Sequence, residues 1–218
     1  MKKSGVIFDM DGLMFDTQCI YDQAFKDVLR QAYGLEVPEE MRLAMMGRSG
    51  QDMYDTVNRF YPQVDAPEYI RRSFALVEKR VKTDLVPRPG LDVLIPYLMQ
   101  QGYRLGLASG SNRSIVESNL RSSGLALCFR GSIAGDEVTT GKPDPECYLR
   151  TARLIGCAPE DCYVLEDSPN GVRAGYRAGC SVLMVPNDTE PDEEMVRLCA
   201  GIYKTLADVR DAMEAGIL

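Results

Sequence analysis

Four short polar segments of the sequence hold side chains that could act together on a phosphate ester. Their chemically useful residues are Asp9 and Asp11, Ser109 and Gly110, Lys142, and Glu166 and Asp167. Carboxylates can attack phosphorus, bind a divalent cation or move a proton, while a lysine and a hydroxyl can hold anionic oxygens. Each segment alone has an ordinary explanation as a turn, a helix cap or a solvated loop. Together they would supply the parts of a phosphoryl-transfer site.

The elements that must position these residues alternate regularly along the chain. Short apolar runs compatible with β-strands occupy residues 6–8, 103–108, 131–134, 162–165 and 181–185. Segments with helical spacing occupy residues 89–101, 112–123, 144–155, 170–178 and 205–215. This alternation predicts an α/β fold with a Rossmann-like parallel sheet covered by helices on both faces. Helices should end in the left-handed conformation at Gly102, Gly124, Gly156 and Gly179.

The polar segments all follow predicted strands, directly or after a loop. In an open parallel sheet, ligands collect outside the carboxyl ends of the strands, near a topological switch point. We therefore expect the carboxylates, the serine and the lysine to converge on one edge of the sheet.

Residues 17–85 show helical periodicity and no convincing strand. One apolar stripe comprises Ile20, Ala24, Val28 and Leu29, and two further stripes run through residues 53–60 and 70–81. A helical block that interrupts the α/β alternation after the first strand predicts an inserted cap. We therefore expect a core domain of residues 1–16 and 86–218 and a helical cap domain of residues 17–85. The sequence Val-Pro-Arg-Pro-Gly at 86–90 is the expected re-entry point.

The composition narrows the classes of function. With 25 basic and 32 acidic residues, the 218-residue chain has a formal charge of -7, which repels nucleic acid and anionic membrane surfaces. The absence of histidine excludes Ser-His-Asp and Cys-His catalysis and histidine-ligated metals. Seven scattered cysteines without a C-x-x-C pair argue against a zinc site or a disulfide framework. The acidic charge therefore predicts no nucleic-acid or membrane partner, and since no signal peptide or membrane-spanning stretch is evident, we expect a cytoplasmic protein.

The four polar segments, read with their neighbours, resemble the four motifs of the haloacid dehalogenase superfamily. They read F-D-M-D-G from residue 8, L-A-S-G-S-N from 107, G-K-P-D-P from 141 and L-E-D-S-P-N-G from 165. The resemblance covers essentially the whole chain, in order and at suitable spacing. In particular, the sequence is similar to the β-phosphoglucomutase-like branch of phosphatases and phosphomutases, which has a helical cap after the first motif.

The resemblance implies a role for each acid. Asp9 would be the nucleophile that forms an aspartyl-phosphate, and Asp11 would protonate the leaving oxygen and then activate water. Mg²⁺ would be held by Asp9, the backbone carbonyl of Asp11 and Asp167, with Glu166 either a direct ligand or a supporting partner. The ion would offset the repulsion between an attacking carboxylate and a phosphate dianion.

The same resemblance implies a phosphate-binding set. The Ser109 hydroxyl and nearby backbone N–H groups, including that of Gly110, would hold the equatorial oxygens of the transferring group. Lys142 would add positive charge beside that group.

Departures from the family pattern bear on the activity. Dehalogenases lack the second acid of the first motif, whereas Asp11 is present here. β-Phosphoglucomutases carry a cap histidine and a cap lysine where this chain has Tyr21 and Met46, which favours a phosphatase over a mutase. The cap lysine of phosphonatases has no counterpart at the expected place. Substrate choice is expected from Tyr21 and from the cap loop with Gly47 and Arg48, although an exposed arginine in a helix–helix turn is the ordinary alternative.

We therefore predict a monomeric, Mg²⁺-dependent phosphatase that acts on a small phosphorylated metabolite, with a sugar or sugar-alcohol phosphate as the favoured class. Two alternatives stay open, a β-phosphoglucomutase-like phosphomutase and a catalytically silent binding module. Phosphoglycolate and nucleotides also remain candidate substrates, because the motifs do not identify the leaving group.

Overall fold

The computed structural model describes residues 3–45, 48, 50–187 and 190–218. Within these residues, parallel strands form one six-stranded sheet in the order β3-β2-β1-β4-β5-β6. The strands are β1 (Gly5–Phe8), β2 (Arg104–Ala108), β3 (Gly131–Ile133), β4 (Cys162–Glu166), β5 (Ser181–Met184) and β6 (Gly201–Ile202). The direction of the strand order reverses between β1 and β4, which is the topological switch point of a doubly wound sheet. The predicted Rossmann-like α/β class is confirmed.

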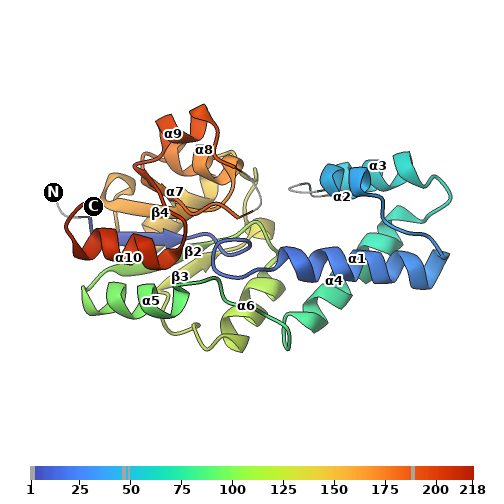
Figure 1. The fold of residues 1–218 in the computed structure, drawn as a ribbon, viewed down its shortest axis with the longest axis horizontal. Coiled ribbons are helices and arrows are strands. Elements are labelled where there is room, and N and C mark those ends of the chain that lie inside the picture. Colours follow the sequence, from blue (N-terminus) through green and yellow to red (C-terminus); the bar gives the residue numbers. More distant parts are fainter. Residues whose placement is uncertain (1–2, 46–47, 49, 188–189) are drawn as a thin grey trace. The chain divides into compact units, whose positions relative to one another are not determined.

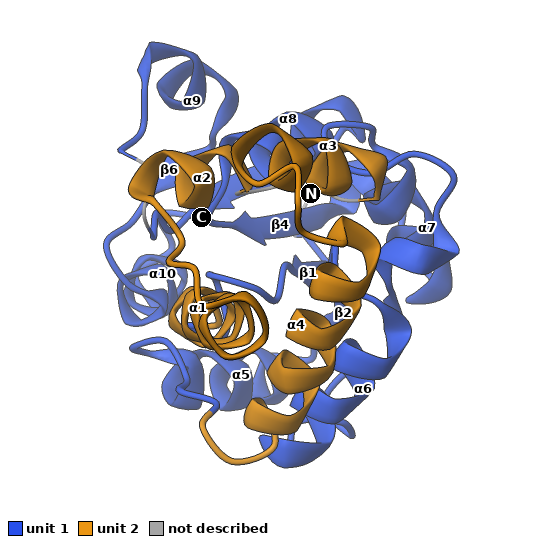
Figure 2. Cartoon of the chain, turned by 90° about the vertical axis from the view of Figure 1, so that its right-hand side faces the viewer, with its two compact units in different colours: residues 1–16, 85–218 blue, residues 17–84 orange. Residues whose placement is uncertain are grey.

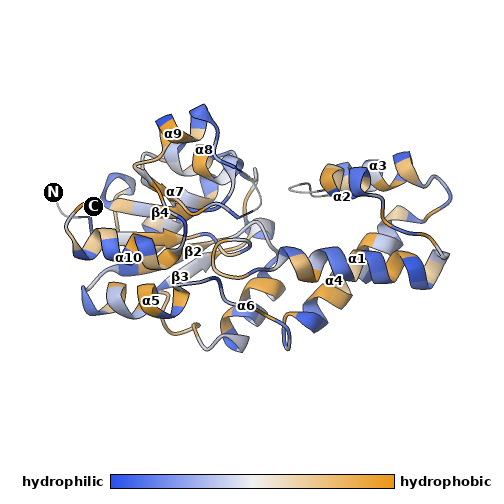
Figure 3. Ribbon diagram, in the orientation of Figure 1, coloured by the Kyte–Doolittle hydropathy of each residue, from blue (hydrophilic) through white to orange (hydrophobic). Residues whose placement is uncertain are grey.

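Helices cover both faces of this sheet (Figure 1). On one face lie α5 (Leu91–Gln100), α6 (Arg113–Ser122) and α10 (Leu206–Glu214), and on the other lie α7 (Glu146–Leu154) and α8 (Pro169–Arg177). Hydrophobic and hydrophilic residues occupy different sides of these helices (Figure 3), so each helix can bury its apolar side against the sheet. None of the described helices has the length and hydropathy needed to cross a membrane.

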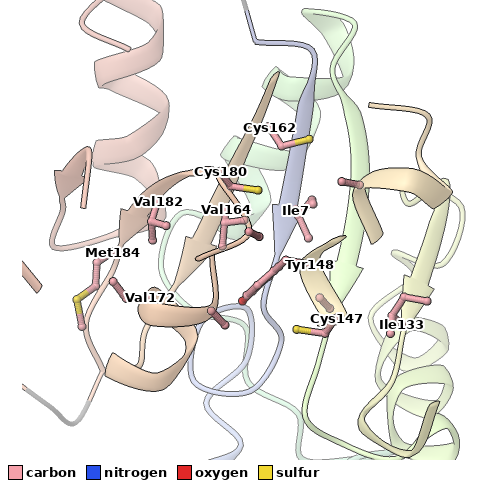
Figure 4. Packing of buried hydrophobic residues seen from close by; sticks show 14 of the residues in the cluster. Ile7, Ile133, Cys147, Tyr148, Cys162, Val164, Val172, Cys180, Val182 and Met184 are labelled. Atoms are coloured by element: carbon pink, nitrogen blue, oxygen red, sulfur yellow. The ribbon is translucent and has the colours of Figure 1, made fainter. Parts of the chain in front are cut away.

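The core between the sheet and α7 and α8 is built from aliphatic side chains, methionines, cysteines and one tyrosine (Figure 4). Ile7, Val164 and Val182 come from three neighbouring strands, and Tyr148 and Val172 come from the two covering helices. All five are at most 1% exposed. Complete burial of such an aliphatic side chain contributes about 1.5–3 kcal/mol, so this layer fixes α7 firmly on the sheet.

Four turns have the conformation expected from their glycines. Gly102, Gly124, Gly156 and Gly179 have φ values of 80°, 73°, 71° and 82°. They follow the ends of α5, α6, α7 and α8, where a left-handed residue closes the last helical turn.

Several short elements were not predicted from the sequence. They are α9 (Glu193–Leu198), β6 and the 3₁₀ turns η1 (Gly135–Glu137) and η2 (Pro159–Asp161). β6 has only two residues, and its pairing with β5 comes from the tertiary fold. Elements of this length carry too few residues to establish a period of their own.

The chain divides into two compact units, coloured separately in Figure 2. Unit 1 contains residues Met1–Asp16 and Leu85–Leu218 and holds the sheet, while unit 2 contains Thr17–Asp84. The helices of unit 2 are α1 (Gln18–Tyr33), α2 (Glu39–Met45), α3 (Gln51–Phe60) and α4 (Ala66–Arg80), and its described residues include no strand. The three predicted apolar stripes fall on α1, α3 and α4. α2 was not predicted, because it buries only Met41.

Candidate active site

Three neighbouring strands place the candidate catalytic residues at one edge of the sheet. Asp9 follows β1, Ser109 follows β2, and Glu166 is the last residue of β4. The backbone N–H of Asp9 donates to the carbonyl of Leu165 at 3.0 Å, so the ladder between β1 and β4 continues up to the nucleophile candidate. Because β1 stands between β2 and β4, the carboxyl ends of all three strands meet there.

Lys142, on the loop before α7, brings the acids of this edge together. Its Nζ donates to Asp9 Oδ1 at 2.5 Å, to Glu166 Oε1 at 2.7 Å and to the carbonyl of Ala108 at 3.2 Å. The ammonium group has three donors, and these acceptors use all of them. The Lys142 side chain is only 13% exposed, so its charge is held in a fixed place.

Glu166 is completely buried and accepts hydrogen bonds on both oxygens. Oε1 accepts from Lys142 Nζ and from the Tyr148 hydroxyl at 2.6 Å. Oε2 accepts from the backbone N–H groups of Asp167 and Ser168 and from the Ser168 hydroxyl, each at 3.0 Å. Ser168 is also the N-cap of α8, so this carboxylate lies at the helix end that favours negative charge.

Asp11 belongs to a second hydrogen-bonded group, on the β2 side. Its Oδ2 accepts from the hydroxyls of Ser109 at 3.0 Å and Ser111 at 2.8 Å. The Ser111 N–H also donates to Ser109 Oγ at 2.9 Å. Gly110 is exposed. A Cβ added to Gly135 would lie only 2.1 Å from the carbonyl oxygen of Gly110. A side chain at Gly135 would therefore displace the loop that carries Ser109 and Gly110.

The arrangement of acids fits a divalent cation bound by oxygen. Carboxylate oxygens of Asp9, Glu166 and Asp167 all lie within 4.8 Å of one another. Asp11 Oδ1 is buried and has no partner among the described residues, so the site also holds an unsatisfied acceptor. Lys142 supplies one positive charge against these carboxylates, which leaves negative charge for a hard cation such as Mg²⁺ to neutralise.

The pKa values of the acids reflect this crowding of negative charge. The pKa of Asp9 is raised to about 8, chiefly by burial; the charge of Lys142 opposes this rise, and the charges of Glu166 and Asp11 add to it. Burial, Glu166 and Asp9 raise the pKa of Asp167 well above its ordinary value. For Glu166, burial acts in the same direction, but the charge and hydrogen bonds of Lys142, Tyr148 and Ser168 outweigh it and lower the pKa. The charge of Glu166 is therefore already stabilised by its neighbours, whereas the charged forms of Asp9 and Asp167 would be stabilised by a bound cation.

Gly12 and Gly171 make room for this cluster. Gly12 has φ +89°, and a Cβ there would lie 2.1 Å from Asp167 Oδ2. A Cβ on Gly171, in the first turn of α8, would lie 1.7 Å from Glu166 Oε1. Both glycines are therefore needed where backbone passes directly beside a carboxylate.

The candidate specificity residues belong to unit 2. Tyr21 is half-buried in α1, and its ring meets Phe74 edge-on with centroids 6.1 Å apart. Arg48 is exposed and lies 3.9 Å from the carboxylate of Asp52. Gly47 lies outside the described residues. Their role in substrate choice stays a prediction.

Sequence reasoning did not identify Tyr148 and Ser111 as members of the site. Ser111 stands inside the second motif and was available as a hydroxyl two residues after Ser109. For Tyr148, the sequence allows only the general expectation that the hydroxyl of a buried tyrosine has a hydrogen-bond partner. The sequence does not tell which partner that is.

The profile of one protein family matches residues 6–185, and its description is haloacid dehalogenase-like hydrolase. The chain belongs to this family. The matched residues contain all four of the polar motifs and the whole of unit 2. Membership makes the chain an enzyme of the hydrolase class, as the resemblance of its motifs implied.

Relatives of similar length support the assignment. The chain is 31% identical over 212 residues to a phosphorylated carbohydrates phosphatase of Thermotoga maritima, covering 97% of this hydrolase and 90% of that protein. It is 31% identical over 221 residues to a probable pseudouridine-5'-phosphatase of Drosophila melanogaster, with coverages of 96% and 92%. Among solved structures, a putative beta-phosphoglucomutase from Thermotoga maritima superposes with a TM-score of 0.81 at 24% identity, covering 97% and 99% of the two chains. This last likeness shows the fold alone.

Proposed function

We propose that this hydrolase is a Mg²⁺-dependent phosphatase that cleaves a small phosphorylated metabolite through a phosphorylated Asp9. The observation that carries the proposal is the position of Asp9 at the carboxyl end of β1, paired with Lys142 and grouped with Asp167 and Glu166. A carboxylate so placed can attack phosphorus while fixed positive charge stabilises the transferring oxygens. The phosphatase relatives support the same reaction class.

The reaction has two steps. An oxygen of Asp9 forms a bond to phosphorus while the bond to the leaving oxygen breaks, and Asp11 gives that oxygen a proton. Asp11 then takes a proton from water as the water attacks phosphorus, which releases inorganic phosphate and restores the Asp9 carboxylate. The positive charge of Lys142 stabilises the equatorial oxygens in both steps, and the Ser109 hydroxyl binds them. In the structure the hydroxyls of Ser109 and Ser111 both donate to Asp11; when the Ser109 hydroxyl turns to the phosphoryl group, Ser111 keeps the Asp11 carboxyl beside the reacting atoms.

Asp9, Asp167 and the backbone carbonyl of Asp11 would hold Mg²⁺ in this scheme. When bound, the ion supplies positive charge that lets an anionic carboxylate approach a phosphate dianion. Glu166 was left open between a direct ligand and a supporting partner, and its five hydrogen bonds favour the supporting role.

We propose that residues 17–85 act as the cap domain, with Tyr21, Gly47 and Arg48 selecting the leaving group. A sugar or sugar-alcohol phosphate is the favoured substrate class, because a relative of nearly equal length is named for phosphorylated carbohydrates. The cytoplasmic location and the monomeric state stay predictions from composition and organisation.

The test is the release of inorganic phosphate from a panel of sugar, sugar-alcohol and nucleoside phosphates, with Mg²⁺ or with chelator. We expect Mg²⁺-dependent release that falls by a factor of about 10⁴ or more in Asp9→Asn. Asp92→Asn, which removes an exposed acid from the first turn of α5, is the matched control and should keep wild-type activity. Undiminished release by Asp9→Asn would contradict the mechanism. Interconversion of sugar phosphate isomers without net release would point to a phosphomutase instead.

A further inference from the structure

Tyr148 takes no part in the chemistry above, yet it lies fully buried against the groups that do. It stands on the first turn of α7, a few residues after Lys142, and is 0% exposed. Its hydroxyl donates to Glu166 Oε1 at 2.6 Å, and its ring centroid lies 4.8 Å from Lys142 Nζ. Tyr148 therefore touches both members of the Lys142–Glu166 ion pair.

Glu166 has no acceptor capacity left for a further ligand. A carboxylate offers about four lone-pair sites, and five donors already point at this one. The backbone of Gly171 also lies directly against this carboxylate, because a Cβ there would stand 1.7 Å from Oε1. Of the proposed catalytic residues that the structure describes, only Lys142 donates a side-chain hydrogen bond to Glu166. Among the described residues, its role is therefore to hold this lysine.

The Tyr148 hydroxyl controls how strongly Glu166 holds Lys142. Both donors share Oε1, so part of the negative charge on that oxygen is taken up by the tyrosine. Without the hydroxyl, Oε1 would have Lys142 as its sole donor, and the lysine would be drawn toward Glu166. Its bond to Asp9 Oδ1, at 2.5 Å, would weaken as a result.

We propose that Tyr148 is a positioning residue, whose hydroxyl shares Glu166 Oε1 with Lys142 and so keeps the lysine ammonium beside Asp9. The proposal rests on the phosphatase function proposed above. In the proposed mechanism, the charge of Lys142 stabilises the transferring group most strongly in the transition state, where negative charge builds up. Loss of the Tyr148 hydroxyl should therefore lower kcat and leave KM unchanged.

The test compares Tyr148→Phe with Tyr69→Phe. Tyr69 is also fully buried, and its hydroxyl donates to the carbonyl of Phe25 at 3.1 Å in unit 2, so its loss removes a buried hydrogen bond without touching the acid cluster. We expect Tyr148→Phe to lower kcat about 10- to 100-fold. Inhibition by vanadate, which mimics pentacovalent phosphorus, should weaken by the same factor. Tyr69→Phe should lose thermal stability and keep the wild-type kcat.

A crystal structure of Tyr148→Phe supplies a second readout that needs no turnover. We expect the Lys142 Nζ to Asp9 Oδ1 distance to exceed about 4 Å, the limit of an ion pair. If the wild type releases no phosphate from any substrate, the proposed function fails, while this distance still decides the positioning role. An unchanged Lys142–Asp9 pair would overturn the inference.

Two kinetic results would also overturn it. One is a kcat for Tyr148→Phe within about threefold of wild type, and the other is a rise in KM with kcat retained. Should Tyr148→Phe not fold, Glu166→Gln serves as the second variant, because it removes the charge through which Tyr148 acts. The inference then requires a loss of kcat at constant KM, and wild-type kinetics of Glu166→Gln would refute it.

Discussion

Replacing Gly12 by alanine tests whether the Asp167 carboxylate has to stand where the structure places it. The new Cβ would lie 2.1 Å from Asp167 Oδ2 and 2.9 Å from its Cγ. Ordinary contact begins at 3.4 Å, so the carboxylate oxygen has to retreat by about 1.3 Å. Because Oδ2 is the far end of a side chain, it can move by rotation without unfolding the protein.

The functional cost should be much larger than the cost in stability. A non-glycine residue at the φ of +89° found here lowers the free energy of unfolding of the protein by about 1–2 kcal/mol. Mg²⁺ demands near-ideal octahedral geometry with ligand distances of about 2.0–2.1 Å, so a displacement of about 1 Å would take Asp167 out of reach of the ion that we propose it binds. We expect the Mg²⁺ concentration for half-maximal activity to rise about 10- to 100-fold, and kcat/KM to fall about 100-fold at fixed Mg²⁺.

Gly102→Ala provides the matched control. Gly102 has φ +80°, belongs to the same unit, and has nothing within 4 Å of an added Cβ. Both variants should therefore show the same loss of thermal stability in chelator, measured by circular dichroism. Only Gly12→Ala should lose the additional stabilisation that Mg²⁺ gives the wild type, and only Gly12→Ala should lose phosphate release.

If Gly12→Ala needs the same Mg²⁺ concentration for half-maximal activity as the wild type, the reasoning is refuted, because the displaced carboxylate then has no part in metal binding. Equal losses of activity in both variants would refute it as well, since backbone strain alone would explain them.

Three further predictions concern protonation, a helix cap and substrate choice. The pKa of Asp9 is raised to about 8, chiefly by burial, and that of Asp167 is raised as well, so Mg²⁺ must displace protons from both acids at neutral pH. The apparent Mg²⁺ affinity should therefore rise by about tenfold or more per pH unit from pH 6 toward 8, with proton release detectable by calorimetry. Asp65→Ala removes the acceptor of the Glu68 N–H at the start of α4, and chemical denaturation should show a loss of about 0.5–2 kcal/mol. Arg48→Ala should change relative kcat/KM values across the substrate panel by about tenfold, whereas the exposed Arg72→Ala should leave them unchanged; equal profiles would remove Arg48 from substrate selection.

The fold class could be predicted because its signal is distributed along the chain. Five apolar runs and five helical segments alternate, and each agrees with its neighbours on one parallel sheet. Glycines such as Gly156 and Gly179 marked helix ends, because a left-handed residue is required there. The short α2, α9 and β6 escaped prediction, since they are stabilised by packing and pairing with distant segments more than by any local pattern.

The candidate site was predictable only in part. Asp9, Ser109 and Glu166 follow different strands, and the geometry of a parallel sheet brings such positions to one edge whatever the loops do. The hydrogen-bond partners of these residues could not be predicted from the sequence. The sequence left Glu166 open between a direct metal ligand and a supporting partner, and its hydrogen bonds from Tyr148 and the start of α8, which favour the supporting role, come only from the structure.

The sequence by itself determined the types of chemical group in this protein and the strand ends that carry them, because these depend on composition and on local periodicity. Only the tertiary structure decided that Asp9 and Glu166 accept hydrogen bonds from the same lysine, and that Gly12 and Gly171 stand where a side chain would collide with a carboxylate. Those contacts join residues far apart in the chain, such as Gly12 with Asp167 and Lys142 with Asp9. They depend on the register between strands and on the rotation of α7 over the sheet, which long-range packing sets and a local pattern does not encode.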